Sequence, residues 1–363
     1  MNEEGITKLS EDKKSHELRG EIMKRIMALM ILSLVAFALM IITSACNDAN
    51  SVNEADVNFK TTDVQAFLKL ADKSPSVASF TPNYNEEEAM AISSSLGKDF
   101  YPIKVGQQLT KTDENLTLVK DSVTASGTLV QQYDGKLIIA GTFQPPTYGI
   151  RTRVDTIIEK PYSTTITRQI HYERIDSTGN DTLDWKVVGI SLPAGGTGGD
   201  DISIQKLTLA SQDSTITVDD PNTYFFDVGN DNDNNLDNDI ENFKAGYNGS
   251  ILWKNWRQLF TWFKGNQAVT LTVEILSSSS DPDVVTLTYG AMMDGKYRTK
   301  EKFDLISTTP DGILYRKVYQ THWKTHQFPG RRHAVINALP RNVVYDSDST
   351  VVEKTWGIPY KVN

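Results

Sequence analysis

The chain of 363 residues has little cysteine, little histidine and fewer basic than acidic residues, and each shortage excludes a class of function. Its single cysteine, Cys46, excludes an intrachain disulfide framework, a CxxC redox site and a cysteine-based zinc cluster. Five histidines leave few candidates for general-base or metal chemistry. The 37 basic against 46 acidic residues give a net charge of −9, which argues against a nucleic-acid binder, because phosphate contacts need clustered Lys and Arg.

The N-terminus carries an export signal. Residues 26–45 contain no charged side chain, the basic pair Lys24 and Arg25 precedes them, and Cys46 follows. The segment Thr43-Ser44-Ala45-Cys46 resembles the lipobox of bacterial lipoproteins, although Thr43 stands where that family has an aliphatic residue. The resemblance implies cleavage before Cys46, acylation of its thiol (palmitate among the acyl chains) and a lipid anchor in the outer membrane of a bacterial cell envelope.

Two other interpretations of the apolar segment stay open. Twenty apolar residues also span the ~30 Å hydrocarbon core, as an uncleaved signal anchor in the inner membrane would. A buried core helix is the third interpretation. In both membrane cases the basic pair predicts that the rest of the chain lies outside the cytoplasm.

The remaining chain predicts a mainly β fold with two antiparallel β-rich domains. Residues 46–61 are polar and are expected to form a lipidated tether, and 62–218 a mostly β domain that begins with two short helices. The Asn/Asp-rich residues 219–250 read as a linker. Residues 251–363, with about seven short strands, resemble an immunoglobulin-like β-sandwich in architecture only.

Local patterns place several elements within this plan. Thr62 or Asp63 is expected to cap a first helix whose apolar residues lie on one face. Asn85 with Glu88 forms a capping box for a second helix, which is expected to end at Gly97. Asp134-Gly135 predicts a hairpin turn, and Ala194–Asp201 a flexible turn. Strands are expected at 164–175, 185–192, 202–209, 268–276, 285–289, 297–306, 313–319, 333–336, 343–345 and 356–362.

An acidic run in the linker is a candidate metal site. Its members place an oxygen ligand at every second residue: Asp231, Asp233, Asn235, Asp237 and Asp239. The spacing resembles the calcium loops of EF-hands and thrombospondin type 3 repeats, which implies Ca²⁺ as the ion. Leu236 and Asn242 stand where an EF-hand has Gly and Glu, so a solvated linker without any cofactor is the alternative.

Aromatic residues beyond the linker are a candidate binding surface. Trp253, Trp256 and Trp262 lie within ten residues, and exposed indole rings can stack on the apolar faces of sugars. Burial in an interdomain interface is the alternative. His322, His326 and His333 could ligate zinc, although their spacing also fits exposed histidines of a strand connection.

These patterns favour a membrane-anchored protein that binds or scaffolds and is not an enzyme. No catalytic residue is nominated, because the chain has neither a G-x-S-x-G elbow nor an H-E-x-x-H motif. The partners expected are the membrane and a glycan or protein ligand, not nucleic acid. An envelope hydrolase with an interdomain cleft is the alternative from another class.

Overall fold

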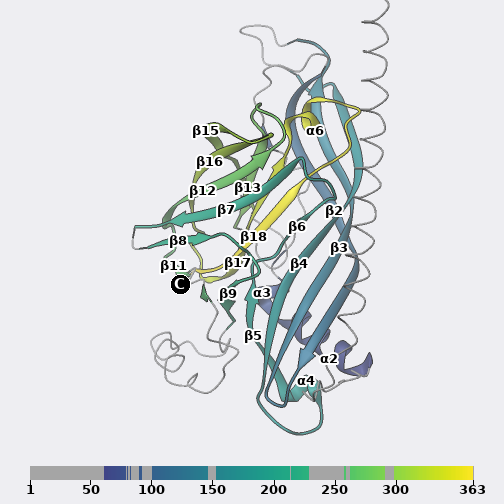
Figure 1. The fold of residues 1–363 in the computed structure, drawn as a ribbon, viewed down its shortest axis with the longest axis vertical. Helices are drawn as coiled ribbons and strands as arrows, with labels where there is room; N and C mark the ends of the chain where they lie inside the picture. The colour runs from purple at the N-terminus through teal and green to yellow at the C-terminus, as the bar shows by residue number, and fades with distance from the viewer. Residues whose placement is uncertain are drawn as a thin grey trace, which may run out of the picture. The chain divides into compact units, whose positions relative to one another are not determined.

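The computed structural model describes residues 61–78, 80, 82, 90–91, 100–145, 153–212, 214–228, 257–258, 262–290 and 298–362. They belong to the compact unit Asn58–Asn363, which is mainly β, with two sheets and a few short helices (Figure 1). The mainly β fold that the period-two patterns predict is therefore confirmed.

The larger sheet, sheet A, curls into a half-barrel and runs in the order β1-β2-β3-β4-β6-β18-β17-β13-β14, with β5, β9, β10 and β11 attached at its sides (Figure 1). Its pairs are antiparallel, apart from β10 with β9 and β11 with β18. The strands are β1 (Met90–Ala91), β2 (Tyr101–Lys120), β3 (Thr124–Thr142), β4 (Thr156–Arg174), β5 (Trp185–Ser191), β6 (Ala194–Gly196), β9 (Tyr224–Asp227), β10 (Arg257–Gln258), β11 (Trp262–Phe263), β13 (Val284–Tyr289), β14 (Thr299–Lys302), β17 (Gly330–Leu339) and β18 (Lys354–Val362).

The smaller sheet, sheet B, is antiparallel in the order β15-β16-β12-β7-β8. Its strands are β7 (Ile202–Ala210), β8 (Thr215–Val218), β12 (Ala268–Ser277), β15 (Asp304–Asp311) and β16 (Leu314–Lys324). In β12, Val269, Leu271, Val273 and Ile275 are buried while the residues between them are half-buried, so the predicted alternation is confirmed.

The main hydrophobic core lies between the two sheets. It joins buried side chains of β7 and β12 in sheet B to those of β13, β17 and β18 in sheet A, with Trp323 and Tyr360 among the largest. The rings of these two residues lie 5.6 Å apart between their centroids. Two sheets with a shared apolar core are the sandwich-like packing that the alternating strands predict.

The described helices are short: α2 (Thr61–Lys73), α3 (Pro75–Ala78), α4 (Asp181–Asp184) and α6 (Arg341–Tyr345). The predicted first helix corresponds to α2, whose Phe67 and Ala71 are buried against sheet A. Phe67 contacts Tyr172 and Trp185 at ring-centroid distances of 4.7 and 5.3 Å. The apolar stripe of α2 thus closes one end of the sheet.

Both sheets cross the boundary expected between the two domains. Strand β7 precedes that boundary, yet it pairs along β12, with Leu209 opposite Leu271. Strand β6 likewise joins β4 to β18. The strands on the two sides of residues 219–250 therefore share their sheets, because long-range pairing, and not proximity in the sequence, decides which strands are neighbours.

The prediction of a hairpin turn at Asp134-Gly135 is wrong. Both residues lie inside β3, where Asp134 is opposite Thr110 of β2 and Ser163 of β4. A Cβ atom on Gly135 would lie 1.9 Å from the carbonyl oxygen of Gln108. The glycine serves a close approach of two strands, which is the other common reason for glycine within a strand.

Three further local predictions fail for the same kind of reason. Met90 and Ala91, expected in the second helix, form β1 and pair with β2, and the rest of that helix lies outside the described residues. Residues 343–345, expected as a strand, lie in α6, which begins after Pro340. The strand expected at 297–306 divides into β14 in sheet A and β15 in sheet B. Tertiary pairing overrides local propensity at these places.

Candidate functional site

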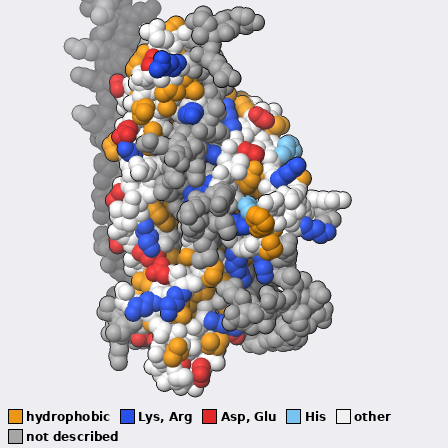
Figure 2. All heavy atoms as spheres, turned by 180° about the vertical axis from the view of Figure 1, so that it is seen from behind, with side chains coloured by type: hydrophobic (Ala, Val, Ile, Leu, Met, Phe, Trp, Pro, Cys, Tyr) orange, Lys and Arg blue, Asp and Glu red, His pale blue; other side chains and the backbone are white. Residues whose placement is uncertain are grey.

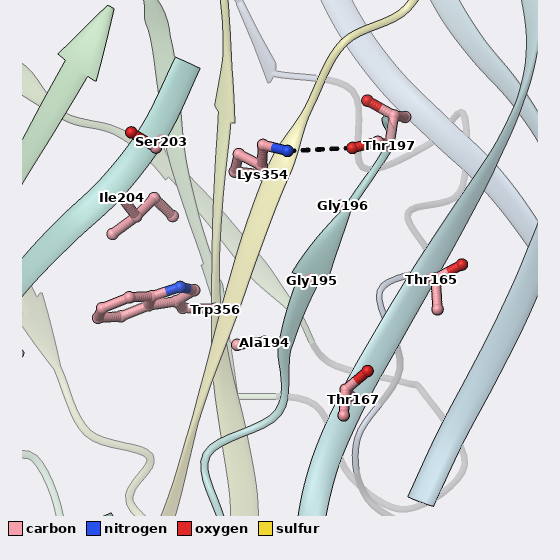
Figure 3. A pocket seen from close by; sticks show the side chains of 10 residues that line it. All are labelled: Thr165, Thr167, Ala194, Gly195, Gly196, Thr197, Ser203, Ile204, Lys354 and Trp356. Atoms are coloured by element: carbon pink, nitrogen blue, oxygen red, sulfur yellow. Dashed lines mark hydrogen bonds between the residues drawn. The ribbon is translucent and has the colours of Figure 1, made fainter. Parts of the chain in front are cut away.

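A hollow of about 450 Å³ opens where β4, β6, β7 and β18 meet (Figure 3). Strand β6 forms its floor, because it pairs with β4 on one side and with β18 on the other. The hollow is lined by Thr165, Thr167, Ala194, Gly195, Gly196, Thr197, Ser203, Ile204, Lys354 and Trp356. A floor of alanine and glycine leaves room above the backbone, so a ligand can approach it closely.

The two glycines of β6 are required by the close approach of backbones. A Cβ on Gly195 would lie 1.8 Å from the carbonyl oxygen of Thr165. Gly196 has a φ of 150°, and its Cβ would lie 2.2 Å from the carbonyl oxygen of Glu353. Any larger residue would push β6 away from β4 or β18 and deform the floor.

The walls of the hollow offer hydroxyl groups, one ammonium group and one indole ring. Lys354 Nζ donates a hydrogen bond of 3.1 Å to the carbonyl oxygen of Thr197, and Thr197 Oγ1 accepts one of 2.9 Å from the backbone N–H of Glu353. Ser203 Oγ accepts a bond of 2.8 Å from Gln205. Trp356 is largely buried behind these groups. The ten described lining residues include no acid, so this chemistry suits a small ligand rich in hydroxyl or anionic oxygen atoms.

A buried carboxyl lies directly beside the hollow, on the chain leading into β18. Glu353 is fully buried, and its Oε2 accepts a short hydrogen bond from Gln107 Nε2 of β2 and a weaker one, 3.5 Å, from the Tyr162 hydroxyl of β4. Burial raises the pKa of Glu353 to about 7, although hydrogen bonds, the first of them from Gln107, act in the opposite direction. This carboxyl therefore changes charge near neutral pH, one residue away from Lys354.

A buried guanidinium lies on the inward face of β4. Arg168 is 1% exposed, and within the described part of the chain none of its side-chain nitrogens has a hydrogen-bond partner. Its guanidinium carbon lies 4.8 Å from the centroid of the Phe80 ring, a cation–π distance. Burial lowers the pKa of Arg168 to about 10, opposed by Tyr133 and Glu114. Its neighbours Thr165 and Thr167 point the other way, into the hollow.

The three histidines considered as zinc ligands have separate surroundings. His322 is exposed, with Nδ1 3.0 Å from Thr270 Oγ1; His326 Nδ1 accepts from the Phe328 backbone N–H at 3.1 Å; His333 is buried against Phe80. Burial holds the pKa of His333 well below its usual value. Among the described residues, no group of three His, Cys, Asp or Glu side chains is placed to hold a metal ion.

Most of the other site predictions fall on residues that the structure does not describe. These are the lipidation site Cys46, the calcium candidates Asp231, Asp233, Asn235, Asp237 and Asp239, and the aromatic candidates Trp253 and Trp256. Trp262 contributes its backbone to β11, and the neighbouring Phe263 is buried, with its ring 6.1 Å from that of Trp323. The aromatic side chains described around this segment thus pack in the core.

The sequence pattern did not predict the hollow. The pattern of Ala194–Asp201 predicts a flexible turn, whereas residues 194–196 form β6 and bridge two strands. The available signal was a pair of glycines between two strand patterns, which can mark a close backbone approach as well as a turn. Among the wall residues, Trp356 begins the strand expected at 356–362, and Lys354 lies just before it.

No protein family model, curated protein or solved structure matches this chain. In the described part of the chain, none of the helices has the length and apolar character needed to cross a membrane. Residues 26–45 lie outside that part.

Proposed function

We propose that this protein is a membrane-anchored binding protein of the bacterial cell envelope, whose hollow on β6 takes a small, hydroxyl-rich ligand such as the end of a glycan chain. The anchor is supported by the apolar residues 26–45 and by the lipobox-like segment that ends at Cys46. Two or more acyl chains on one cysteine give stable membrane attachment.

The observation that carries the binding role is the lining of the hollow. Three threonines and one serine surround the glycine backbone of β6, and the Lys354 ammonium and the Trp356 indole complete the lining (Figure 3). Hydroxyl groups can donate and accept, so they match sugar hydroxyls in either direction. A few polar groups beside an apolar ring are typical of small-molecule sites.

A scaffolding role without a small ligand is the first alternative, and a hydrolase with an interdomain cleft is the second. The hydrolase hypothesis needs two separate domains, but β6 and β7 share sheets with strands from beyond residue 251. The glycan-binding hypothesis keeps its ligand class but moves from Trp253, Trp256 and Trp262 to the hollow.

Binding to a panel of bacterial cell-wall and surface glycans tests the proposal. Thr165→Val and Lys354→Ala change the wall of the hollow without removing a core side chain. Each is expected to weaken binding about tenfold, because each removes one hydrogen bond between the protein and the ligand. Thr217→Val, on exposed β8 of sheet B, is the matched control and should bind as the unchanged chain does. Equal binding by all three variants would place the ligand elsewhere, and no binding to any glycan would leave the scaffolding role.

A further inference from the structure

Four large apolar side chains are exposed together at one end of sheet A. They are Val119, Val123, Ile175 and Leu183, with exposed fractions of 72%, 57%, 56% and 61%. Residues 119–124 and 173–186, here named the α4 tip, carry them on the β2–β3 turn, the end of β4 and helix α4. Clustered exposed apolar side chains mark interaction sites more often than single ones do.

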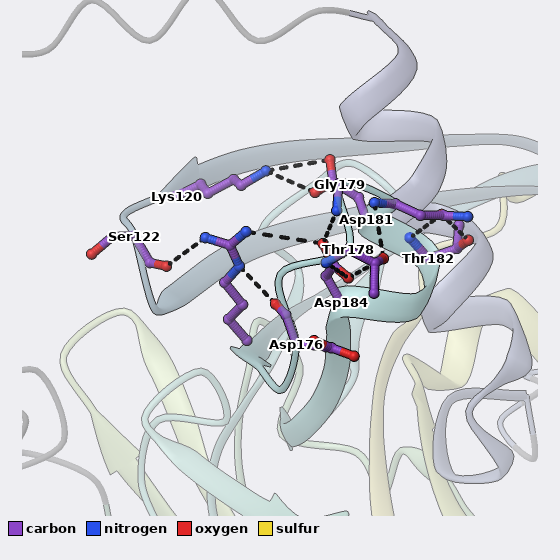
Figure 4. Close-up of polar contacts among 10 residues, drawn as sticks. Lys120, Ser122, Asp176, Thr178, Gly179, Asp181, Thr182 and Asp184 are labelled. Carbon is purple, nitrogen blue, oxygen red and sulfur yellow. Dashed lines mark hydrogen bonds and ion pairs between the residues drawn. The ribbon is translucent and has the colours of Figure 1, made fainter.

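The segments of the α4 tip are tied to each other. The Arg174 backbone N–H donates 2.9 Å to the carbonyl oxygen of Val123, and the Ile175 N–H donates 2.6 Å to that of Asp184. Lys120 Nζ lies 3.2 Å from Asp181 Oδ1. These bonds join the β2–β3 turn, the end of β4 and α4 into one end of sheet A, and this end presents the four apolar side chains to solvent (Figure 4).

A buried carboxylate makes the α4 tip a built structure. Asp184 accepts hydrogen bonds of 2.8 Å from the backbone N–H of Thr178 and of Gly179, and Asn180 caps α4 by accepting from the Thr182 N–H at 3.1 Å. The turn that presents Ile175 and Leu183 is therefore held in shape by its own polar groups (Figure 4).

The described chain begins at this same end. In α2, Phe67 has Lys120 Nζ 5.3 Å from its ring centroid, whereas Asp72 lies 3.8 Å from Lys111 Nζ. Because Lys120 is at the tip end of β2 and Lys111 comes earlier in that strand, α2 runs away from the tip. Its first residue, Thr61, lies about 9 Å beyond Phe67 along the helix, towards the tip.

The length of chain before α2 limits the distance to the anchor. Residues 46–60 number fifteen, and a fully extended chain of that length reaches at most about 50 Å. A lipid on Cys46 would hold the start of α2, and with it the α4 tip, within that reach of the bilayer.

We propose that the α4 tip contacts the surface of the bilayer to which the chain is anchored, with Val119, Val123, Ile175 and Leu183 among the lipid headgroups; this inference rests on the proposed anchor. The α4 tip contains three basic residues (Lys120, Arg174 and Lys186) and five acidic ones (Asp121, Glu173, Asp176, Asp181 and Asp184). Apolar burial, not attraction to anionic lipid, then drives the contact, which should form on phosphatidylcholine and persist in high salt. Figure 2 shows hydrophobic side chains reaching the surface at the lower end of the molecule between charged ones.

The test uses the full chain, reconstituted in phosphatidylcholine vesicles that contain a lipid with a nitroxide near the headgroup. A nitrobenzoxadiazole dye is attached to Leu183→Cys and, as the control, to Ile313→Cys, which is 94% exposed between β15 and β16 of sheet B. Acylated Cys46 leaves the new cysteine as the one free thiol; where mass spectrometry finds Cys46 free, both variants carry Cys46→Ser. We expect the dye at 183 to lose fluorescence to the nitroxide, and the dye at 313 to keep it.

A charge variant separates contact by the α4 tip from mere proximity. Val123→Asp with Leu183→Asp should restore the fluorescence of a dye on Ile175→Cys, whereas Ile313→Asp should leave that dye quenched. A chain that resists carbonate washing but shows no quenching at 183 overturns the inference and leaves the anchor intact. If the emission of the dye at 183 shifts only when the protein-to-lipid ratio is raised, a second copy of the chain covers the α4 tip. This result also overturns the inference of membrane contact.

Washing the chain off the vesicles would refute the proposed anchor instead. The same labelled chain, added to vesicles from solution, still decides the inference: quenching at 183 supports contact by the tip itself, and its absence overturns it.

Discussion

The buried carboxyl of Glu353 predicts a specific pH dependence of stability. Burial raises its pKa from 4.5 to about 7 in the folded chain. Below pH 4.5 the carboxyl is protonated in both states. Between pH 4.5 and 7 the unfolded chain releases a proton that the folded chain keeps, so the free energy of unfolding falls as pH rises and levels off above 7.

The size of the effect follows from the shift. A difference of about 2.5 pKa units at ~1.4 kcal/mol each amounts to roughly 3 kcal/mol, a large part of the stability of a domain. Glu353→Gln removes the titration and keeps a polar group beside Gln107 and Tyr162. We expect the variant to gain about 3 kcal/mol relative to the unchanged chain between pH 4.5 and pH 8.

Urea denaturation of residues 58–363 at pH 4.5, 6, 7 and 8 measures this difference. Glu159→Gln, a change of the same kind at an exposed position of β4, is the control. A free-energy difference between Glu353→Gln and the unchanged chain that is the same at every pH would refute the reasoning, because Glu353 would then have the same proton affinity in both states.

Three further predictions concern single contacts. Lys317→Met leaves the Asp283 carboxylate buried without the ammonium that lies 2.8 Å away, and urea denaturation should show that the free energy of unfolding falls by about 3–5 kcal/mol. Recovery of this free energy on adding Asp283→Leu would support the unpaired charge as the cause, and a loss below about 1 kcal/mol would contradict it. Gly195→Ala places a methyl group against the carbonyl oxygen of Thr165 and should cost about 1–3 kcal/mol and weaken ligand binding, whereas Gly198→Ala, with open space around it, should not; equal effects would refute the close-approach argument. Burial alone would raise the pKa of Asp184, but hydrogen bonds from Thr178 and Gly179 outweigh it and lower the pKa. Asp184→Asn should therefore reduce the melting temperature at pH 7, and this reduction should disappear as the pH falls below the pKa of the folded carboxyl. A reduction of the same size at pH 2 would contradict the assignment.

Elements with a regular pattern were predictable. In β12 the apolar residues alternate, and in α2 they recur at helical spacing, because each element buries one face against the core. These signals are local, and they determine the type of element.

Pairing partners were not predictable in this way. Nothing in the pattern of β7 indicates that it pairs with β12 across residues 219–250, so the expected domain boundary divided a sheet. In sequence, the Asp134-Gly135 pair and the glycines of β6 resemble turn residues. In the structure their glycines allow close contacts between strands. A glycine's neighbours in space decide between the two roles.

The polar groups around the hollow were the least predictable. Glu353 and Arg168 belong to residue types that are usually exposed, and both are buried inside sheet A. Their positions follow from strands β4 and β18, which β6 holds together. Buried charged groups next to a pocket become visible only after the strand order is known.

The most direct test of the proposed membrane-anchored role is the intact mass of the N-terminal peptide of the membrane-bound chain, measured for the unchanged protein and for Cys46→Ala. We expect a peptide that begins at Cys46 and carries acyl chains, with both processing and acylation lost in the variant. An unprocessed peptide that still contains residues 26–45, identical in both chains apart from the substituted residue, would contradict the lipid anchor and assign attachment to the apolar segment itself.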